Sequence, residues 1–502
     1  MGTKKLLIAC LYLTCSFFSC KETQSNDPET CLKLIGCWKG GLVQKNVLIE
    51  RDLELRLISL TPDSIIELSA IYELGTRSRF WKYMIPITCQ SGDISWLAHK
   101  GILSENGDTM HVVKNWKGEK SDWKFIRDRG SDAFMAQLMS SENTTYIYNT
   151  PADSDDGWNC ENLNKVGLDE SKITQLVHHI KQGKFGDIHS LVICRKGKLI
   201  LEEYFALNGE LSGMFVNCTF RSKIHHLASV TKGVLSLLVG AAIDKGFITD
   251  VQDPISKYLP QYKKSFNQEN GKISISDLLT MRSGLKWEQF RYGWDDRRNN
   301  AASMYKCDDV IKYIIERPIA HAPGTVFKYS NGDPTILGMV LKNACRRQVE
   351  DFAKQYIFDP LNISYYSWTH YPDGSLETDG GLALCSRDLA KIGQLVLQNG
   401  KWKEKQLISQ NWIQESTVGR VTLTKKRNYG YYWNEMEYYI DDRTDNAIFV
   451  PGDGGQFLAI LPYLDMIIVI TAGNYDQDPT TTWWSLIRNE VLPAITDINL
   501  KI

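Results

Sequence analysis

The sequence lacks an excess of charge of either sign. Its 502 residues include 58 Lys and Arg against 59 Asp and Glu, which gives a formal net charge of -1. A domain that binds nucleic acid carries a strong basic patch or a basic excess, so no nucleic-acid partner is indicated. The chain is also too long for one ordinary hydrophobic core, and we expect two or more domains.

Metal-binding spacings and bilayer-spanning runs are also absent from the sequence. There is no Cys-x-x-Cys pair and no His cluster with zinc spacing, so neither a metal site nor a cofactor is indicated. No stretch after the N-terminus is long and apolar enough to span a membrane. Of the twelve cysteines, those after Cys20 form a dispersed, odd set that gives no disulfide framework, and most are predicted to be small buried residues.

The N-terminus has the features of an export signal. Two lysines precede an apolar run that ends at Ser19-Cys20, which predicts a secretory signal peptide over residues 1–19. A small residue before Cys resembles a bacterial lipoprotein signal and implies that Cys20 is lipidated; a plain signal peptide is the alternative. We therefore expect an exported lipoprotein of the bacterial outer membrane, on its periplasmic or its surface face. Residues 20–30 are polar and are predicted to be a flexible tether.

Residues 31–130 have the alternating pattern of β-strands. Asn106-Gly107 between two strand-like runs is a strong hairpin signal. About seven or eight short strands fit an up-and-down antiparallel sheet that closes as a barrel or packs as a sandwich. The Gly36-Cys37-Trp38 start resembles that of lipocalin-like barrels, which makes ligand binding the alternative to a structural or docking role.

A polar, turn-rich linker is predicted over residues 131–155 and a second domain over residues 156–502. Apolar residues in the second domain recur with the period of helices in some stretches and of strands in others. We predict an α+β fold in which an antiparallel sheet, made from both ends of the domain, holds a helical cluster between them. The expected strands are 190–194, 199–204, 447–450, 457–461 and 466–471, and the expected helices include 169–183, 275–281, 310–315 and 335–341.

One helix of this domain carries a candidate nucleophile. A long apolar run predicts that a buried helix begins near Ser229. Residues i and i+3 share one helix face, which places the Ser229 hydroxyl beside the Lys232 amine. The positive end of the helix dipole favours a developing alkoxide, and a partly dry pocket makes a lysine a better proton acceptor. Ser-x-x-Lys is also common by chance, and an ordinary first helical turn is the alternative.

Two later stretches carry further polar groups. Tyr329-Ser330-Asn331 precedes a helical pattern, where a phenol can point into a cleft. Gly452–Gln456 enters a strand, and its glycines would let a ligand lie along the strand edge with a free N–H facing an oxyanion. Taken singly, the tyrosine is explained as a core aromatic and the glycines as a tight turn.

In this order, the three stretches resemble those of the serine β-lactamase and penicillin-binding-protein superfamily. The likeness is to class C β-lactamases, D-alanyl-D-alanine carboxypeptidases, family VIII esterases and 6-aminohexanoate-dimer hydrolase; Ser-x-x-Lys is a known motif of the related class A enzymes. This resemblance implies a β-lactamase-like fold. It extends over residues 156–495 and includes segments 276–285, 358–361, 380–383 and 386–390.

The resemblance also implies a role for each matching residue. Ser229 would be the acylated nucleophile, and Lys232 its proton acceptor or electrostatic helper. Tyr329 would act as general acid and base, and Asn331 would bind the substrate. The backbone N–H groups of Ser229 and Gln456 would form the oxyanion hole, where removing one donor typically costs ~10²–10³-fold in rate.

The sequence departs from the superfamily at Asp453-Gly454-Gly455, where Lys-Thr-Gly or His-x-Gly is usual. A lysine or histidine there attracts the carboxylate of a penicillin or a peptidyl-D-alanine, whereas Asp453 would repel it. Two like charges ~4 Å apart cost about 4 kcal/mol at an effective dielectric near 20, before screening. We therefore expect a neutral or cationic ester or amide substrate. The alternative is that Asp453 turns away and only Gly454 and Gly455 matter.

Other residues near these motifs have ordinary explanations. His225 and His226 precede the nucleophile and could form part of a pocket wall, but a role as catalytic base is not expected, since Lys232 and Tyr329 supply it. Trp287, Trp294 and Trp368 are candidate pocket walls for which core packing is the main expectation.

Together these features predict a secreted, lipid-anchored serine hydrolase that acts through an acyl-enzyme on a small ester, amide or peptide. Two alternatives stay open. One is a D-Ala-type peptidase or penicillin-binding protein that acts on cell-wall peptides. The other is a catalytically inactive envelope protein that only binds a ligand.

Overall fold

The computed structural model describes most of the chain after residue 35. The described parts are the backbone of the strands between residues 36 and 127, and residues 146–205, 224–440, 443–475 and 479–497. The predicted signal peptide, Cys20 and the tether lie outside the described residues. In the described part of the chain, no helix is long and apolar enough to cross a membrane.

The chain forms two compact units, one of residues 1–73 and 77–137 and the other of residues 74–76 and 138–502. The end of the predicted linker packs on the second unit. Tyr148 is buried and its hydroxyl donates to Ile200 O at 2.9 Å, while the Tyr146 hydroxyl donates to Glu203 at 2.6 Å. The side chains of Tyr146 and Tyr148 thus anchor this end of the segment, and a linker over residues 131–155 stays a prediction.

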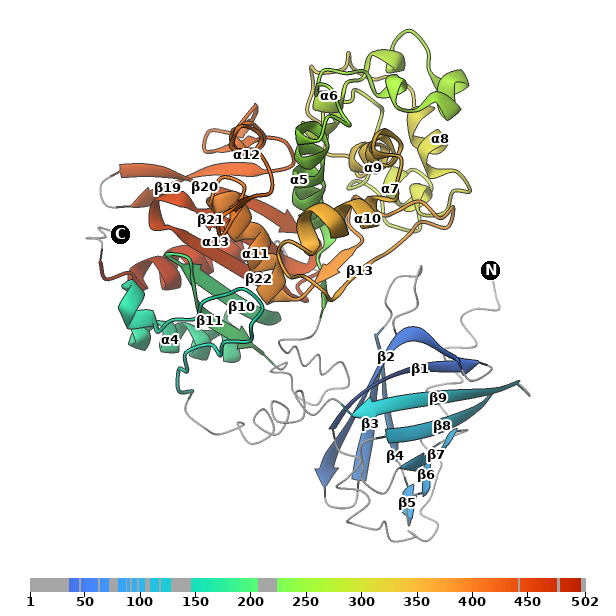
Figure 1. Cartoon of the computed structure of the whole chain (residues 1–502), viewed down its shortest axis with the longest axis vertical. Coiled ribbons are helices and arrows are strands. Elements are labelled where there is room, and N and C mark those ends of the chain that lie inside the picture. Colours follow the sequence, from blue (N-terminus) through green and yellow to red (C-terminus); the bar gives the residue numbers. More distant parts are fainter. Residues whose placement is uncertain are drawn as a thin grey trace. The chain divides into compact units, whose positions relative to one another are not determined.

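The strands described in the first unit form one antiparallel sheet (Figure 1). Its order is β4-β3-β2-β1-β9-β8-β7-β6-β5, so the first and last strands pair with each other and the other pairs join consecutive strands. This is an up-and-down arrangement; its closure as a barrel stays a prediction. The strands are β1 (Gly36–Gln44), β2 (Val47–Thr61), β3 (Ser64–Ile71), β4 (Phe80–Pro86), β5 (Thr88–Gln90), β6 (Asp93–Trp96), β7 (His99–Leu103), β8 (Thr109–Trp116) and β9 (Glu119–Arg127).

The second unit is built on an eight-stranded antiparallel sheet, which confirms the predicted α+β class. The order β11-β10-β22-β21-β20-β19-β18-β17 places the C-terminal strand β22 beside β10, so both ends of the unit meet in one sheet. The strands are β10 (Ile188–Arg195), β11 (Lys198–Tyr204), β17 (Val421–Thr424), β18 (Arg427–Tyr429), β19 (Asn434–Ile440), β20 (Arg443–Gly452), β21 (Gln456–Leu461) and β22 (Met466–Ala472). Small sheets are made by β12 (His225–His226), β13 (Tyr366–Trp368) and β14 (Leu382–Leu384), and by β15 (Lys401–Trp402) and β16 (Lys405–Gln406).

The central strands of this sheet are buried on both faces. Along β22, Ile467 and Val469 join one hydrophobic core, whereas Ile468 and Ile470 join the other. Successive strand side chains point to opposite faces, so an unbroken apolar run indicates a strand that is covered on both sides. Helix α11 covers the first face, and α4 and α13 cover the second.

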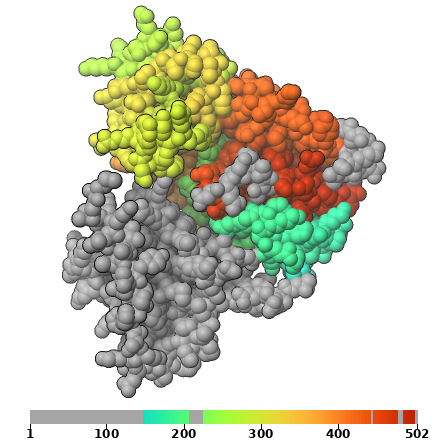
Figure 2. Space-filling model, turned by 180° about the vertical axis from the view of Figure 1, so that it is seen from behind, coloured from blue at the N-terminus to red at the C-terminus, as the bar shows by residue number. Residues whose placement is uncertain are grey.

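The helices follow the predicted pattern and gather mainly in one cluster. Figure 2 shows the cluster in yellow and green beside the orange, red and teal part that contains the sheet. The helices are α4 (Glu170–Lys181), α5 (Thr231–Asp244), α6 (Ile275–Leu279), α7 (Asn300–Met304), α8 (Val310–Ile315), α9 (Gly332–Cys345), α10 (Val349–Ala353), α11 (Ser386–Leu397), α12 (Gln410–Thr417) and α13 (Pro479–Leu486).

Helix α5 lies in the interior of the second unit. Every residue from Thr231 to Ala242 is buried, as its unbroken apolar run predicts. Gly240 permits close packing with α12, because a Cβ there would lie 2.1 Å from the Trp412 ring. The indole Nε1 of Trp412 donates to Ser236 O at 3.0 Å. Such packing fixes the helix that directly follows the candidate nucleophile.

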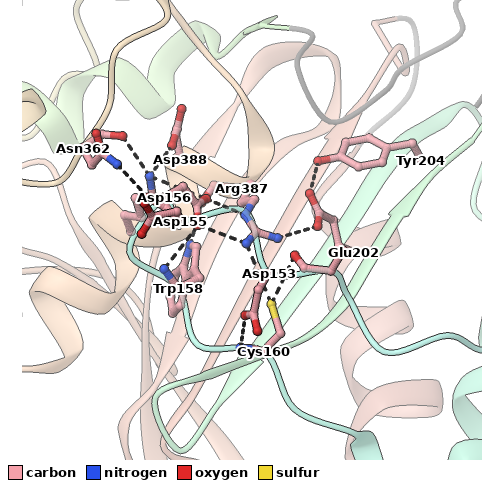
Figure 3. A network of polar contacts seen from close by, with 12 residues as sticks. Asp153, Asp155, Asp156, Trp158, Cys160, Glu202, Tyr204, Asn362, Arg387 and Asp388 are labelled. Atoms are coloured by element: carbon pink, nitrogen blue, oxygen red, sulfur yellow. Dashed lines mark hydrogen bonds and ion pairs between the residues drawn. The ribbon is translucent and has the colours of Figure 1, made fainter. Parts of the chain in front are cut away.

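A buried ionic network joins the start of the second unit to α11 and β11 (Figure 3). The Arg387 guanidinium donates to both carboxylate oxygens of Asp156, at 2.5 and 3.0 Å, and to Glu202 at 2.7 Å. Lys391 lies 2.8 Å from Asp388 and 3.8 Å from Asp156. Burial alone would raise the pKa of Asp156, but the hydrogen bonds and charge of Arg387 lower it to about 2. The pairing keeps these groups charged inside the fold.

Candidate active site

Ser229 lies in a short 3-10 turn, η3 (Ala228–Val230), that leads directly into α5. Ala228, just before it, has a φ of +47°, a left-handed conformation that costs about 1–3 kcal/mol for a residue with a Cβ. Strand β20 reaches this turn through Gly452, where a Cβ would lie 2.5 Å from Leu227 O. A strained turn and a glycine-only contact therefore hold Ser229 at the end of β20.

Lys232 lies beside Ser229, as the i, i+3 spacing predicts. Its Nζ donates to Ser229 Oγ at 2.9 Å, to Asn331 Oδ1 at 3.3 Å and to Asp379 O at 2.5 Å. The side chain is almost fully buried, with 1% of its surface exposed. An ammonium group has three protons, and these three acceptors satisfy all of them.

Tyr329 completes the group around the nucleophile. Its hydroxyl donates to Ser229 Oγ at 2.8 Å, and Lys232 Nζ lies 5.2 Å from the centre of its ring. Tyr329 is in the loop before α9. The Ser330 hydroxyl holds this loop, because its oxygen accepts from the N–H groups of Gly332 and Asp333 at 3.0 and 3.3 Å. The structure thus brings together the three residues predicted to act on the substrate.

Gln289 fixes Asn331 and was not predicted. Its Oε1 accepts from Asn331 N at 2.9 Å and from Trp287 Nε1 at 2.7 Å. Its Nε2 donates to Asn331 Oδ1 at 3.4 Å. These contacts join the loop after Leu285 to the Tyr-x-Asn stretch. No local pattern in the sequence predicts them.

The glycine-rich stretch forms a tight turn between β20 and β21. Gly454 and Gly455 have φ values of +74° and +93°, which glycine adopts without strain. Gln456 is buried; its Nε2 donates to Ala472 O at 2.7 Å and its Oε1 accepts from Ala472 N at 3.2 Å. The turn packs beside η3, so the strand edge and the nucleophile lie next to each other.

Asp453 is exposed on this turn. Its Oδ1 accepts from Gly454 N at 3.0 Å. Because a Cβ at Gly454 would lie 2.4 Å from the Tyr475 ring, this tyrosine packs directly on the turn. Asp453 therefore places a carboxylate on the exposed side of the turn, in contrast to a site with Lys or His at this position.

The tryptophans and histidines near the motifs have different environments. Trp287 and Trp368 are buried core residues, as expected, whereas Trp294 is 45% exposed and its ring contacts Tyr305. His225 Nε2 lies 2.8 Å from His189 Nδ1, and His226 is exposed. Phe290, 74% exposed, packs against the Tyr329 ring with 5.7 Å between centroids and supplies an aromatic surface that was not predicted.

Metal ligands do not cluster in the described residues. Across 146–205, 224–440, 443–475 and 479–497, no three His, Cys, Asp or Glu side chains are grouped to hold a metal ion. The cysteines described there carry free thiols: Cys194, Cys345 and Cys385 are buried, and Cys160 and Cys307 are half-buried.

Comparison with known proteins identifies the family. The sequence model of the Beta-lactamase family matches residues 187–489, which is more than half of the chain. The chain belongs to the Beta-lactamase family. This confirms the resemblance inferred from the motifs, and the matched region contains Ser229, Lys232, Tyr329 and the Gly452–Gln456 turn.

Relatives in the Beta-lactamase family are distant. Protein flp of Staphylococcus aureus (strain N315) is 23% identical over 199 residues, which are 40% of this chain and 38% of the relative; the match thus spans about two fifths of that protein's length. The 6-aminohexanoate-dimer hydrolase of Paenarthrobacter ureafaciens is 23% identical over 286 residues, 53% of this chain and 70% of the relative.

A solved structure shares the fold. A putative 6-aminohexanoate-dimer hydrolase from Bacillus anthracis superposes with a TM-score of 0.53 and 19% identity, covering 72% of this chain and 92% of that one. The second unit therefore has the β-lactamase-like fold that the sequence predicts.

Proposed function

We propose that the protein is a serine hydrolase that cleaves an ester or amide through an acyl-enzyme. The observation that carries the proposal is the position of Ser229 Oγ, which accepts hydrogen bonds from Lys232 Nζ at 2.9 Å and from the Tyr329 hydroxyl at 2.8 Å. A nucleophile held between two groups that can exchange protons is the arrangement that activated hydroxyls require. Membership of the Beta-lactamase family and the relatives named hydrolases support the same reaction class.

In the proposed reaction, Ser229 Oγ attacks the substrate carbonyl carbon as its proton passes to Lys232 in its neutral form, or to Tyr329 in its phenolate form. The new C–O bond turns the carbonyl oxygen into an oxyanion, which the N–H groups of Ser229 and Gln456 would stabilise. The bond to the leaving group then breaks, and the Tyr329 hydroxyl protonates the departing alcohol or amine. Water attacks the acyl-enzyme by the reverse proton path and releases the acid and free Ser229.

The proposed substrate is uncharged or cationic on the side of Asp453. Support comes from the exposed carboxylate of Asp453 on the turn that follows β20 and packs beside η3. A substrate carboxylate placed there would meet like charge, and about 1.4 kcal/mol of repulsion already lowers affinity tenfold. Asn331, held by Gln289, is proposed to bind the polar part of the substrate.

The proposal is tested by chemical labelling and by a substrate comparison. A fluorophosphonate probe should label Ser229 in the wild type and fail to label Ser229→Ala. Wild-type protein should hydrolyse a neutral ester faster than a cephalosporin, and Asp453→Asn should narrow that difference. An unlabelled wild type would favour a protein that only binds a ligand, and a preference for the cephalosporin would favour a penicillin-binding protein or peptidase.

We also propose that the protein is exported and held on the cell envelope through a lipid on Cys20. The support is the Lys-rich start, the apolar run and the Ser19-Cys20 sequence. In a bacterial host, labelled palmitate should be incorporated into the wild type and into the matched variant Cys15→Ala, but not into Cys20→Ala. Equal incorporation into Cys20→Ala would contradict the anchor.

A further inference from the structure

Behind Lys232, five residues form a closed ring of hydrogen bonds. Lys232 Nζ donates to the main-chain carbonyl of Asp379 and to Asn331 Oδ1. The Thr335 hydroxyl lies 2.8 Å from the main-chain oxygen of Asn331 and 2.9 Å from the Tyr371 hydroxyl. Tyr371 in turn contacts the carboxyl group of Asp379. Both groups that hold Lys232, other than Ser229, therefore belong to one hydrogen-bonded circuit.

Four of the five residues in the ring are buried. Lys232, Thr335, Tyr371 and Asp379 are buried to within 3% of complete, and Asn331 is half-buried. In such an environment polar groups polarise each other strongly. The number of protons available inside the ring therefore decides which of its hydrogen bonds exist at one time.

Three contacts in the ring share two hydroxyl protons. Thr335 and Tyr371 each have one proton, but the chain from Asn331 O through Thr335 and Tyr371 to Asp379 has three links. Since a carboxylate can only accept, one link lacks a proton when Asp379 is ionised. A protonated Asp379 donates to Tyr371, Tyr371 donates to Thr335, and Thr335 donates to Asn331 O, so that every link is complete.

The contact of the second carboxylate oxygen of Asp379, Oδ2, does not supply the missing proton. The Tyr305 hydroxyl lies 2.6 Å from Glu377 Oε1 and 3.1 Å from Asp379 Oδ2, so two carboxyl groups share its single proton. Burial raises the pKa of Asp379 to about 6, and the charge of Glu377 adds to the rise, while the charge of Lys232 opposes it. Burial also holds the pKa of Tyr371 and of Tyr305 well above the usual value. Among the groups whose pKa is raised here, Asp379 is the one whose pKa lies between acid and neutral pH.

We propose that Asp379 is a positioning residue of the active site, which completes the chain to Asn331 when it is protonated and places a negative charge behind Lys232 when it is ionised. The inference rests on the proposed function, because it concerns the proton acceptor of the nucleophile. An ionised Asp379 favours the ammonium form of Lys232 and so opposes proton transfer from Ser229. A neutral side chain of the same shape removes that charge and keeps the chain.

The test is the pH dependence of Ser229 labelling by a fluorophosphonate, measured as a second-order rate without turnover of substrate. Asp379→Asn keeps the size of the side chain and can donate to Tyr371. In the curve of labelling rate against pH, the rise on the acid side should lie about one pH unit lower for Asp379→Asn than for the wild type. This is the usual effect of removing one close opposite charge. The maximum rate should stay close to that of the wild type, because the hydrogen-bonded chain remains.

Tyr371→Phe gives a second, independent reading. The Tyr371 hydroxyl donates to the ionised Asp379 carboxylate and so lowers its pKa. Without this hydrogen bond Asp379 holds its proton to higher pH, and the acid side of the labelling profile should move to lower pH by a smaller amount than in Asp379→Asn. Glu203→Gln is the matched control: burial raises the pKa of Glu203 to about 7, and it accepts from Tyr146 at 2.6 Å on β11. This control should leave the labelling profile unchanged.

The outcomes are distinct. The inference is overturned if the wild type and Asp379→Asn have the same labelling rate at every pH. It is also overturned if the variant is slower at every pH but its curve is not shifted along the pH axis. Both results leave the proposed function intact. If Asp379→Asn does not fold, an unmoved profile in Tyr371→Phe overturns the inference and a small shift to lower pH supports it. An unlabelled wild type overturns the proposed function and this inference with it.

Discussion

Tyr329 donates a hydrogen bond of 2.8 Å to Ser229 Oγ, across 100 positions of the sequence. The contact depends on two separate pieces of local structure, the strained turn at Ala228 and the Ser330 cap of the loop before α9. Lys232 approaches the same oxygen from the adjacent helical turn. The nucleophile is therefore held by one near and one distant residue, and each can be removed separately.

Replacing Tyr329 with Phe should remove the proposed acid and base while keeping the ring that packs against Phe290. General acid–base catalysis contributes about 10²–10⁴-fold, so kcat/KM should fall by that order. The thermal midpoint should change little, since the hydroxyl faces Ser229 and not the core. Steady-state kinetics on the best ester substrate measures the effect. Tyr439→Phe, on the exposed face of β19, is the control and should behave as wild type; equal rates in both variants would exclude the role of Tyr329.

Gln289→Ala should weaken substrate binding more than it slows the chemical step. The variant removes the acceptor of the Asn331 N–H and of Trp287 Nε1, so Asn331 loses its fixed orientation. An unmade hydrogen bond to a buried group costs ~1–3 kcal/mol, which predicts a rise in KM of about tenfold. Gln261→Ala removes a comparable contact, to Asn343 at the surface, and should leave KM unchanged. A variant with unaltered KM would show that Gln289 does not position Asn331.

The elements with strong local periodicity could be predicted from sequence. Residues 310–315 form α8 as predicted, and β21 and β22 fall within a residue of their predicted bounds. The contact between Ser229 and Lys232 follows from helix geometry alone. These features depend on neighbours in the chain, which the sequence displays directly.

Contacts between distant segments could not be predicted. Strand β19 reads Asn434-Glu-Met-Glu-Tyr-Tyr-Ile and lacks a clear apolar alternation, because it lies near one end of the sheet order and is only partly covered. Gln289 contacts Asn331 through two hydrogen bonds, and the main-chain oxygen of Asp379 contacts Lys232 through one. No spacing rule marks such residues, although Asp379 directly precedes the Gly380-Gly381 pair noted in the family resemblance.

Arg387→Met should destabilise the second unit. The variant removes the guanidinium that bridges the carboxylates of Asp156 and Glu202, and breaking one side of a buried ion pair costs about 3–5 kcal/mol. Chemical denaturation at neutral pH measures the loss. Arg298→Met is the matched control, because Arg298 pairs with Asp296 at the surface and its loss should leave the denaturation midpoint unchanged. Equal midpoints for wild type and Arg387→Met would show that the network contributes nothing to stability.

Asp333→Asn should change the pH dependence of stability, because Asp333 is a buried acid at the start of α9. Its Oδ1 accepts from Ser283 Oγ at 2.8 Å, and its Oδ2 is buried without a hydrogen-bond partner. Burial raises its pKa to about 7, against about 3.9 for an exposed aspartate. Between these values the folded protein holds a proton that the unfolded chain releases. The wild type therefore gains stability from this group below pH 4 and loses it as the pH rises through 7.

Asparagine cannot ionise, so Asp333→Asn should be more stable relative to wild type at pH 8 than at pH 5. Only the two pH units between pH 5 and the pKa of about 7 contribute, which sets an upper limit of about 3 kcal/mol for the difference between the two pH values. Denaturation of both proteins at each pH measures it, and contributions from Asp379 and Glu203 cancel because both proteins contain them. Asp351→Asn, exposed on α10, should show no such pH dependence. Equal destabilisation of Asp333→Asn at pH 5 and pH 8 would contradict the prediction. It would mean that Asp333 of the wild type is ionised in the folded protein at both pH values, so that a buried charge and not a neutral acid lies at the start of α9.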